Sequence, residues 1–343
     1  MGTGMAAGRK PRQSNMELLR MVSMFLVLLI HANTSFAPWP IGQEEVLASP
    51  LACTIKFLIE SLCVVCVNAF ILLSGWFGIR FSLRRLLSFV FQVLFFSLLL
   101  QFLPGTEPPS LQSFIDVFTI DQYWFVKAYI ILFILSPALN TFAEQASRKT
   151  FVSVLVLYFI MQTLFGYISN TDWYSDGFSP LPFIGLYLLA RYVRIHQPGF
   201  SRWGKGYDAA VYLGLSFLIT ILSIFLFRYF NTGGRLFNYT DPLVICSSLF
   251  FVLFFSKIKM GEHRWINAMA ISSVGAYLLH MHPRFFMPYF CDPIRQMFSS
   301  KPMAIAALLT FAWVLLVFCT GVLLDKVRWI IWSALEKPFS KQD

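Results

Sequence analysis

Three ionisable residues share one face of the first apolar segment of the chain: Glu17, Arg20 and His31. An α-helix turns about 100° per residue, so the eleven steps from Arg20 to His31 bring the two side chains back to within about 20° of each other. At ~1.5 Å of rise per residue they lie roughly 16 Å apart along the helix, about half the thickness of the hydrocarbon core of a bilayer. Ionisable groups inside a membrane are costly and usually face a cavity or a bundle interior. This stripe is therefore a candidate functional site.

The two ends of the stripe suit different chemistry. A neutral imidazole at His31 can take a proton from a hydroxyl group, as a general base does. The guanidinium of Arg20 can bind a phosphate through two parallel hydrogen bonds. One alternative is that His31 only bonds to a neighbouring helix. Another is a signal peptide, but the many apolar segments that follow and the lack of a clear cleavage site argue against it.

A group of arginines follows the second apolar segment. Arg80, Arg84 and Arg85 come directly after a segment whose end contains the flexible pair Ser74-Gly75. A polyphosphate ligand would need several cations of this kind. Positive charges at a helix end also anchor membrane helices on the cytoplasmic side without any ligand, so both interpretations stay open.

Further candidates lie at the ends of two later segments. Trp124 and Lys127 open the fourth apolar segment, and His280 and His282 lie near the end of the ninth. A Trp at a membrane boundary is usually an interfacial residue, and a Lys near a helix end can extend its ammonium group to the interface. Two histidines two residues apart, without a nearby carboxylate partner, are poorly arranged for one metal ion on a helix, so we expect no metal site.

The elements that must position these residues are membrane helices. The chain has 343 residues, of which 57% are hydrophobic and only 13% charged, which is too apolar for a soluble domain. The net charge of +10 is spread in short groups between apolar segments, so we expect no nucleic-acid partner. Ten segments are expected to span the membrane, at about 16–36, 51–77, 85–103, 122–143, 150–168, 180–195, 208–228, 241–257, 265–288 and 302–324. The sequence thus predicts an all-α polytopic membrane protein with about ten transmembrane helices.

The distribution of Lys and Arg predicts the orientation of these helices. Alternate connections hold nineteen and five of them, and Arg20, Lys56 and Lys127 fall inside the apolar segments. Connections rich in Lys and Arg stay in the cytoplasm, so both termini are expected there. His31 then lies toward the external half of its helix and Arg20 near the cytoplasmic mouth. The predicted organisation is a disordered cytoplasmic N-terminus at 1–15, one membrane domain at 16–325 and a cytoplasmic tail at 326–343.

Four segments, in this order, resemble the membrane acyltransferase-3 family, whose members are ten-helix O-acyltransferases of surface carbohydrates. They are the pattern Arg20-x10-His31, FILLSGWF at 70–77 followed by Arg80, YWFVKAYIILFILSPALN at 123–140, and SSVGAYLLHMHP at 272–283. The resemblance extends over about residues 14–325. It implies that the proposed catalytic histidine of the family falls on His31 and the family's arginine on Arg20.

The same resemblance implies a reaction and its partners. The donor would be an acyl-CoA such as acetyl-CoA, made in the cytoplasm, and the acceptor a hydroxyl of a cell-surface or lipid-linked carbohydrate. The protein would lie among the lipids of the bacterial inner membrane and hold no bound cofactor. Many members with a large extra periplasmic domain carry a carboxylate motif where this chain reads Phe-Val-Lys127, so the chain resembles the compact branch, and no acidic catalytic residue is carried over.

The resemblance assigns roles to the candidate residues. The phosphates of the donor would meet cations at the cytoplasmic face, and the pantetheine arm is of the same order as the roughly 16 Å that separates Arg20 from His31. We name His31 as catalytic. The residues that we expect to bind donor or acceptor are Arg20, Arg80, Arg84, Arg85, Glu17, Ser74, Trp124, Lys127 and His280.

The competing function class is a polytopic transporter or flippase. In such a protein Glu17, Arg20 and His31 would bind substrate or relay protons. A pair of broken helices from inverted repeats would favour this class, and we find no such pair in the sequence. A purely structural scaffold would leave the charged stripe without a role.

Overall fold

The computed structural model describes residues 12–35, 42–106, 108–169 and 171–336, and these residues form helices and connections without a β-strand. The first half of the chain contains α1 (Ser14–Ser35), α2 (Gln43–Ala48), α3 (Pro50–Cys63), α4 (Val65–Phe77), α5 (Leu83–Leu99), η1 (Leu100–Phe102), α6 (Leu111–Thr119), α7 (Trp124–Gln145), α8 (Arg148–Met161) and the π-helix η2 (Gln162–Ile168). The second half contains η3 (Ser175–Gly177), α9 (Pro180–His196), η4 (Gly199–Arg202), α10 (Lys205–Phe230), η5 (Gly234–Phe237), α11 (Pro242–Ser256), α12 (Arg264–Ser272), α13 (Val274–His280), α14 (Pro283–Phe285), the π-helix η6 (Phe286–Cys291), α15 (Asp292–Ser300) and α16 (Met303–Glu336).

Local sequence explains where several helices begin. Residues 14–35 contain neither Gly nor Pro, so α1 continues unbroken from Arg20 to His31. At α11 the side chain of Asp241 accepts hydrogen bonds from the backbone N–H groups of Leu243 and Val244, and Pro242 occupies the first helical position. The hydroxyl of Ser147 caps α8 in the same way.

Eight helical segments are long and apolar enough to cross a membrane: Ser14–Ser35, Pro50–Phe77, Leu83–Phe102, Leu111–Gln145, Arg148–Ile168, Lys205–Phe230, Gly234–Ser256 and Met303–Glu336. The chain is therefore a multi-pass membrane protein with an all-helical fold. The other two predicted spans are helical but shorter. The span predicted at 180–195 corresponds to α9, which has 17 residues, and the one predicted at 265–288 is divided among α12, α13, α14 and η6.

The break in the ninth predicted span has a local cause. The chain departs from helix at Ser273, whose hydroxyl donates to the backbone carbonyl of Ala270 at 2.9 Å. It departs again at His282, directly before Pro283, because the residue before a proline is disfavoured in the helical conformation. The short helix α13 between these two points is the element that carries His280.

Two predicted boundaries differ from the structure. Helix α1 already begins at Ser14, while residues 1–11 of the predicted N-terminal segment lie outside the described residues. Helix α16 continues to Glu336, beyond the predicted end of the membrane domain at 325. Arg328, which the charge count assigned to the cytoplasmic tail, lies buried in α16 with 2% of its surface exposed. An ion pair to Asp325, one turn earlier, makes this burial possible.

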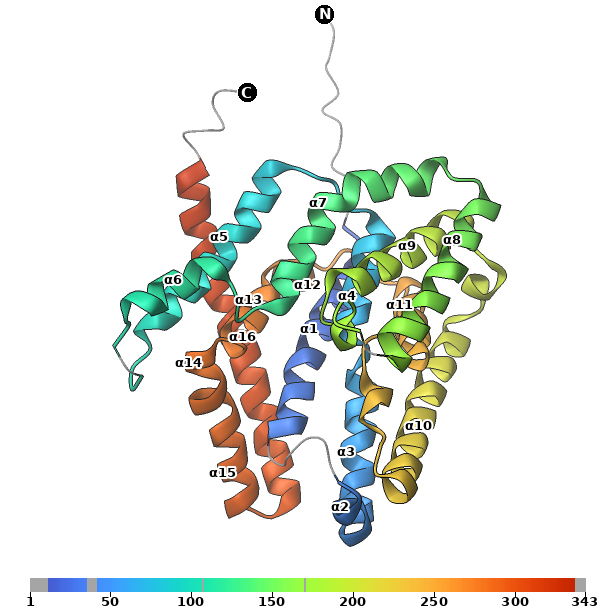
Figure 1. Ribbon diagram of the computed structural model, residues 1–343. Helices are drawn as coiled ribbons and strands as arrows, with labels where there is room; N and C mark the ends of the chain where they lie inside the picture. Colours follow the sequence, from blue (N-terminus) through green and yellow to red (C-terminus); the bar gives the residue numbers. More distant parts are fainter. Residues whose placement is uncertain (1–11, 36–41, 107, 170, 337–343) are drawn as a thin grey trace, which may run out of the picture.

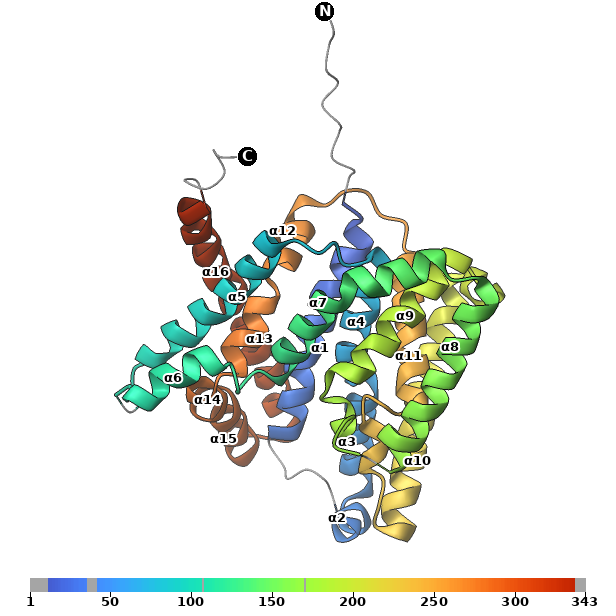
Figure 2. The same cartoon turned by 45° about the horizontal axis from the view of Figure 1, so that its top comes forward.

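Helix α1 lies in the middle of the bundle. It packs against α3, α4, α11, α12, α13 and α16, and Leu19 and Leu28 on it are fully buried. In Figures 1 and 2, α5, α6 and α14–α16 lie on one side of α1, and α8–α11 lie on the other. The beginning of α1 and the end of α16 lie at the same end of the molecule. Because α1 touches both halves of the bundle, it can present side chains to a space between them.

Helices α13 and α16 meet at two glycines. A Cβ on Gly275 would lie 2.5 Å from the carbonyl oxygen of Gly321, and a Cβ on Gly321 would lie 2.4 Å from Cα of Ala276. Close backbone approach of this kind between membrane helices requires small residues. This contact fixes the position of α13, and therefore of His280, against the long helix α16.

A buried polar group holds α5 to α16 near this contact. Oδ1 of Asp325 accepts hydrogen bonds from Nε2 of Gln92 at 2.8 Å and from Nε of Arg328 at 2.9 Å. All three side chains are buried. A charge pair in such a place is tolerated because its members satisfy one another.

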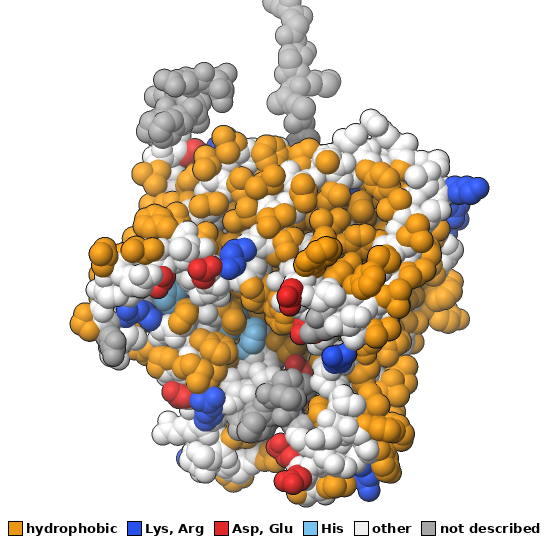
Figure 3. All heavy atoms as spheres, in the orientation of Figure 1, with side chains coloured by type: hydrophobic (Ala, Val, Ile, Leu, Met, Phe, Trp, Pro, Cys, Tyr) orange, Lys and Arg blue, Asp and Glu red, His pale blue; other side chains and the backbone are white. Residues whose placement is uncertain are grey.

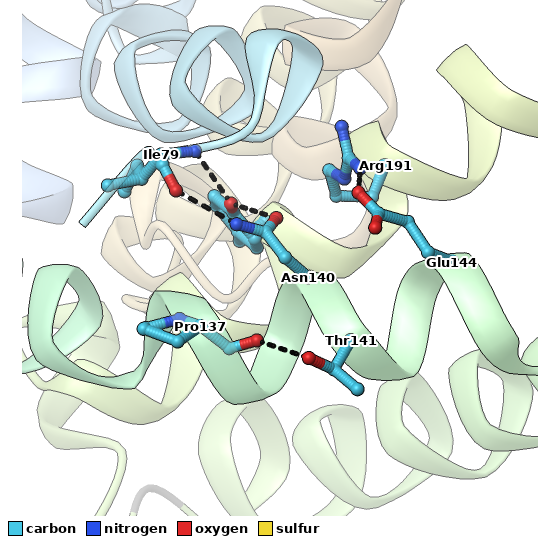
Figure 4. A network of polar contacts seen from close by, with 7 residues as sticks. Ile79, Pro137, Asn140, Thr141, Glu144 and Arg191 are labelled. Atoms are coloured by element: carbon cyan, nitrogen blue, oxygen red, sulfur yellow. Dashed lines mark hydrogen bonds and ion pairs between the residues drawn. The ribbon is translucent and has the colours of Figure 1, made fainter.

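A second network fixes the turn that follows α4 (Figure 4). The hydroxyl of Tyr187 accepts from the N–H of Ile79 at 2.8 Å and donates to Oδ1 of Asn140 at 2.7 Å, while Nδ2 of Asn140 donates to the carbonyl of Ile79 at 2.8 Å. Gly78 adopts φ +72°, and a Cβ there would lie 2.9 Å from Nη1 of Arg191. The turn is thus tied to both α7 and α9, and it delivers the chain to Arg80.

The glycine contact predicts a selective loss of stability. Gly321→Ala forces a Cβ into the backbone of α13, and such overpacking typically costs about 1–3 kcal/mol. We expect the thermal unfolding midpoint of the purified protein to fall. Gly214→Ala on α10 is the matched control, because a Cβ there meets nothing within 4 Å; replacing a mid-helix Gly by Ala is neutral or stabilising. Equal midpoints for the two variants would show that the contact is not tight.

Candidate functional site

A cavity of about 310 Å³ lies beside α1. Its wall is formed by α1, α3, α4, α7, α13, η5 and the segments around 176–178 and 238–239, and His31, Glu60, Trp124 and Asp176 are among the residues that line it. Figure 3 shows a hollow on this face of the molecule in which histidine and acidic side chains are visible. Of the sequence-predicted site residues, His31 and Trp124 therefore line one cavity.

His31 is joined to a second predicted residue. Its Nδ1 lies 3.1 Å from Nε2 of His280, although the two residues are 249 positions apart in the chain. His280 is completely buried, and its own Nδ1 lies 2.9 Å from the carbonyl oxygen of Ala276, one turn earlier on α13. The sequence predicted both histidines as site residues but did not pair them.

The bonding pattern fixes the proton positions of the neutral pair. A carbonyl oxygen only accepts, so Nδ1 of His280 must carry the hydrogen. A neutral imidazole has one N–H, so Nε2 of His280 must accept, and the N–H that it accepts belongs to Nδ1 of His31. This leaves a lone pair on Nε2 of His31. The nitrogen that can take a proton from a ligand is thereby chosen by a residue on another helix.

Aromatic rings and hydroxyls hold the histidine pair in place. The ring of Phe286 meets the ring of His31 edge to face at 5.9 Å, and Phe290 lies 5.3 Å from His280. The hydroxyls of Thr34 and Ser35 donate to the backbone carbonyl of His31, at 3.1 and 2.5 Å. These bonds lie in the last turn of α1 and add side-chain donors to the backbone carbonyl of His31.

A carboxylate faces the same cavity. Glu60 lines it with only 5% of its surface exposed. Its Oε2 accepts a hydrogen bond of 2.7 Å from Nδ2 of Asn33, which also donates to the backbone carbonyl of Lys56 at 3.0 Å. Sequence reasoning did not name Glu60 as a site residue. The available signal was a carboxylate inside an apolar segment, which is a functional-site hypothesis by default.

An aromatic wall closes another side of the cavity. The ring of Trp124 is stacked on Tyr239, with centroids 6.1 Å apart and an angle of 26°, and it meets Phe178 edge to face at 4.6 Å. Next to this wall, Oδ1 of Asp176 accepts a hydrogen bond of 2.5 Å from Nδ2 of Asn238. Trp124 is thus part of a cavity wall and not only a residue of the membrane interface.

The other end of the α1 stripe lies away from the cavity. Nη1 of Arg20 and Oε2 of Glu17 form an ion pair of 2.7 Å, with 29% and 14% of the two side chains exposed. The cavity reaches toward them along α1, since Met24, four residues after Arg20, is also in its wall. Four residues correspond to ~6 Å of helix. The sequence predicted that Arg20 and His31 lie on one face of this helix, and the extent of the cavity along α1 is consistent with that prediction.

The predicted cations after α4 are exposed and do not line the cavity. Arg84 is in contact with Glu336 at the end of α16, and Nη1 of Arg85 donates to the backbone carbonyl of Arg80 at 3.2 Å. This group lies at the end of the molecule where α1 begins (Figures 1 and 2). Their expected role in donor binding stays a prediction.

Two more arginines, on α9, lie close to this group. Arg191 lies beside Gly78 and its Nη2 binds Oε1 of Glu144 at 3.0 Å. The guanidinium of Arg194 lies over the ring of Trp76, with its carbon 5.0 Å from the ring centroid. Sequence reasoning counted both as orientation signals only.

Two predicted binding residues have local partners outside the cavity. The hydroxyl of Ser74 donates to the carbonyl of Phe70 at 3.0 Å and lies 3.3 Å from the hydroxyl of Tyr129. Lys127 is exposed and forms an ion pair of 2.9 Å with Asp121. The expected roles of Ser74 and Lys127 in binding stay predictions.

Comparison with known proteins agrees with the fold and the cavity. Residues 13–324 match the family of acyltransferase domains known as acyltransferase-3. No curated protein and no solved structure matched the chain. The family match covers nearly the whole described chain, including α1 with His31 and α13 with His280. The chain therefore belongs to the acyltransferase-3 family.

Proposed function

We propose that the protein is an integral membrane O-acyltransferase that moves an acyl group, taken here as acetyl from acetyl-CoA, to a hydroxyl of a cell-surface or lipid-linked carbohydrate. Membership of the acyltransferase-3 family supports acyl transfer. The transfer to a hydroxyl is supported by the position of His31, which lines the cavity and whose Nδ1 is bonded to His280. This arrangement suits a general base.

The reaction follows from this arrangement. Nε2 of His31 takes the proton of the acceptor hydroxyl while the hydroxyl oxygen forms a bond to the acyl carbon of the thioester. The bond between that carbon and sulfur breaks, and the proton on His31 passes to the departing thiolate. As His31 becomes positively charged, Nε2 of His280 keeps accepting from its Nδ1–H and stabilises the cation, as the partner of a catalytic histidine does.

The donor is proposed to approach from the cytoplasmic end of α1. Arg20, Arg80, Arg84 and Arg85 supply positive charge for its phosphates there, and Arg191 and Arg194 extend this basic region. The extended pantetheine arm then follows α1 past Met24 into the cavity, a path of roughly 16 Å from Arg20 to His31. For this route we propose that the chain crosses the bacterial inner membrane ten times and that both termini lie in the cytoplasm.

His31 is tested by separating catalysis from donor binding. We expect His31→Ala to lower kcat by ~10²–10⁴-fold and to leave coenzyme A affinity unchanged, because general-base contributions are of that size and the donor phosphates are bound elsewhere. Turnover is measured with radiolabelled acetyl-CoA and affinity by calorimetry on the purified protein. His263→Ala, an exposed histidine, is the control. A folded His31→Ala protein with normal turnover would show that His31 has only a structural role.

His280 is tested as a positioning residue. His280→Leu removes the acceptor for Nδ1–H of His31, whereas His280→Gln keeps an acceptor oxygen near that position. We expect kcat to fall at least ~10-fold in the Leu variant and to recover in part in the Gln variant, with the donor KM unchanged in both. Equal activity of the two variants would contradict a role through the hydrogen bond.

The basic group is tested by charge removal. Replacing Arg80, Arg84 or Arg85 by Ala should weaken coenzyme A binding to differing degrees. A charge-assisted hydrogen bond contributes ~1.5–3 kcal/mol, and less where solvent screens an exposed arginine such as these. Binding should also weaken with rising salt. Lys301→Ala is the control, because Lys301 lies between α15 and α16. Unchanged coenzyme A affinity in all three variants would show that these arginines serve only to orient the membrane helices.

A further inference from the structure

The cavity beside His31 contains a carboxylate with unused bonding capacity. Oε2 of Glu60 is bonded to Asn33, but no side chain or backbone group among the described residues donates to Oε1. A carboxylate can accept about four hydrogen bonds, and a buried charged group that lacks them is costly. A ligand that brings hydroxyl donors into the cavity would satisfy Glu60.

Asn33 links this carboxylate to the proposed base. It stands two residues after His31 on α1, and its side-chain amide reaches across to Glu60 and to the carbonyl of Lys56 on α3. Asn33 thus ties Glu60 on α3 to the helix that carries His31, and both His31 and Glu60 line the cavity. Two groups held in this way can bind two neighbouring hydroxyls of one ligand, one through Nε2 of His31 and one through Oε1 of Glu60.

The charges of the cavity wall are all of one sign. Glu60 and Asp176 line it, and none of the Lys and Arg side chains in the described part of the chain does. Lys56, one turn before Glu60, is buried and is not part of the wall. Like charges brought together in a low-dielectric site repel strongly, so a carboxylate or phosphate on the ligand is disfavoured here.

The remaining wall suits a sugar ring. Trp124, Tyr239 and Phe125 line the cavity with aromatic rings, and the faces of such rings can pack against the C–H groups of a pyranose. A volume of about 310 Å³ is at the lower limit for ligand pockets. The space therefore suits one sugar residue, with the rest of a longer glycan or its lipid outside.

We propose that Glu60 binds the acceptor hydroxyl next to the one that is acylated, and that the acceptor residue is a neutral or amino sugar and not an acidic sugar. This inference rests on the proposed function. The acylated hydroxyl meets Nε2 of His31, the neighbouring hydroxyl donates to Oε1 of Glu60, and the sugar face lies on the aromatic wall. Glu60 is then an acceptor-binding residue that takes no part in proton transfer.

The test compares matched glycosides on the full-length protein in lipid nanodiscs. Octyl β-glycosides of glucose, galactose, mannose, glucosamine and N-acetylglucosamine are each supplied with radiolabelled acetyl-CoA, beside octyl glucuronide and octyl galacturonide. We expect transfer to at least one neutral or amino glycoside, with kcat/KM for its uronide at least ~10-fold lower, a size that electrostatic specificity readily supplies. A uronide that is acetylated as well as or better than its neutral counterpart would overturn the inference and leave the proposed function intact. Transfer to none of the glycosides would overturn the proposed function itself.

The contribution of Glu60 to acceptor binding is tested with a single substitution. Glu60→Gln keeps an oxygen for Asn33 and removes only the charge, so we expect the variant to fold. The acceptor KM should rise about 10-fold while the donor KM stays unchanged. The ratio of kcat/KM between the neutral glycoside and its uronide should become smaller. Glu262→Gln, an exposed acid, is the matched control and should behave like the wild type. A folded Glu60→Gln protein with unchanged acceptor KM and unchanged preference would remove Glu60 from the acceptor site.

Discussion

The hydrogen bond between His31 and His280 is the contact on which the rest of the site depends. It joins the last turn of the first long helix to the end of a short helix that lies late in the chain. Neither imidazole has another side-chain partner among the described residues. The bond therefore needs α13 to be held at a fixed depth, which the glycine contact with α16 provides, and the carbonyl of Ala276 orients the ring of His280.

The membrane explains why so few polar contacts suffice. In a low-dielectric interior a satisfied hydrogen bond is strong and an unsatisfied polar group is costly, so charged side chains that persist there usually have a defined partner. Gln92, Asp325 and Arg328 meet this condition at one end of the bundle, and Asn33 and Glu60 meet it at the other. In the first group both carboxylate oxygens of Asp325 accept hydrogen bonds, from Gln92 and from Arg328. The second leaves an oxygen directed at a cavity, and that difference separates a structural group from a binding one.

Periodicity and hydropathy predicted the helices because both properties are local. The unbroken α1, with Arg20 and His31 on one face, follows from a run without Gly or Pro. The pairing of His280 with His31 and the burial of Arg328 depend on which helices are neighbours, and no local pattern encodes that. Glu60 was visible in the sequence as an intramembrane carboxylate, but only the position of Asn33 connects it with His31.

The two ends of α1 present opposite charge, and this division suits the two substrates. Exposed arginines gather where α1 begins, whereas the cavity near its other end is lined by carboxylates and aromatic rings. A donor with several phosphates is attracted to the first end and repelled from the second, so only its uncharged arm and acyl group would enter the cavity. The wall that is proposed to disfavour an acidic acceptor would thus also keep the charged part of the donor out. The donor and the acceptor can then bind at opposite ends of α1, because the electrostatic field at each end favours only one of them.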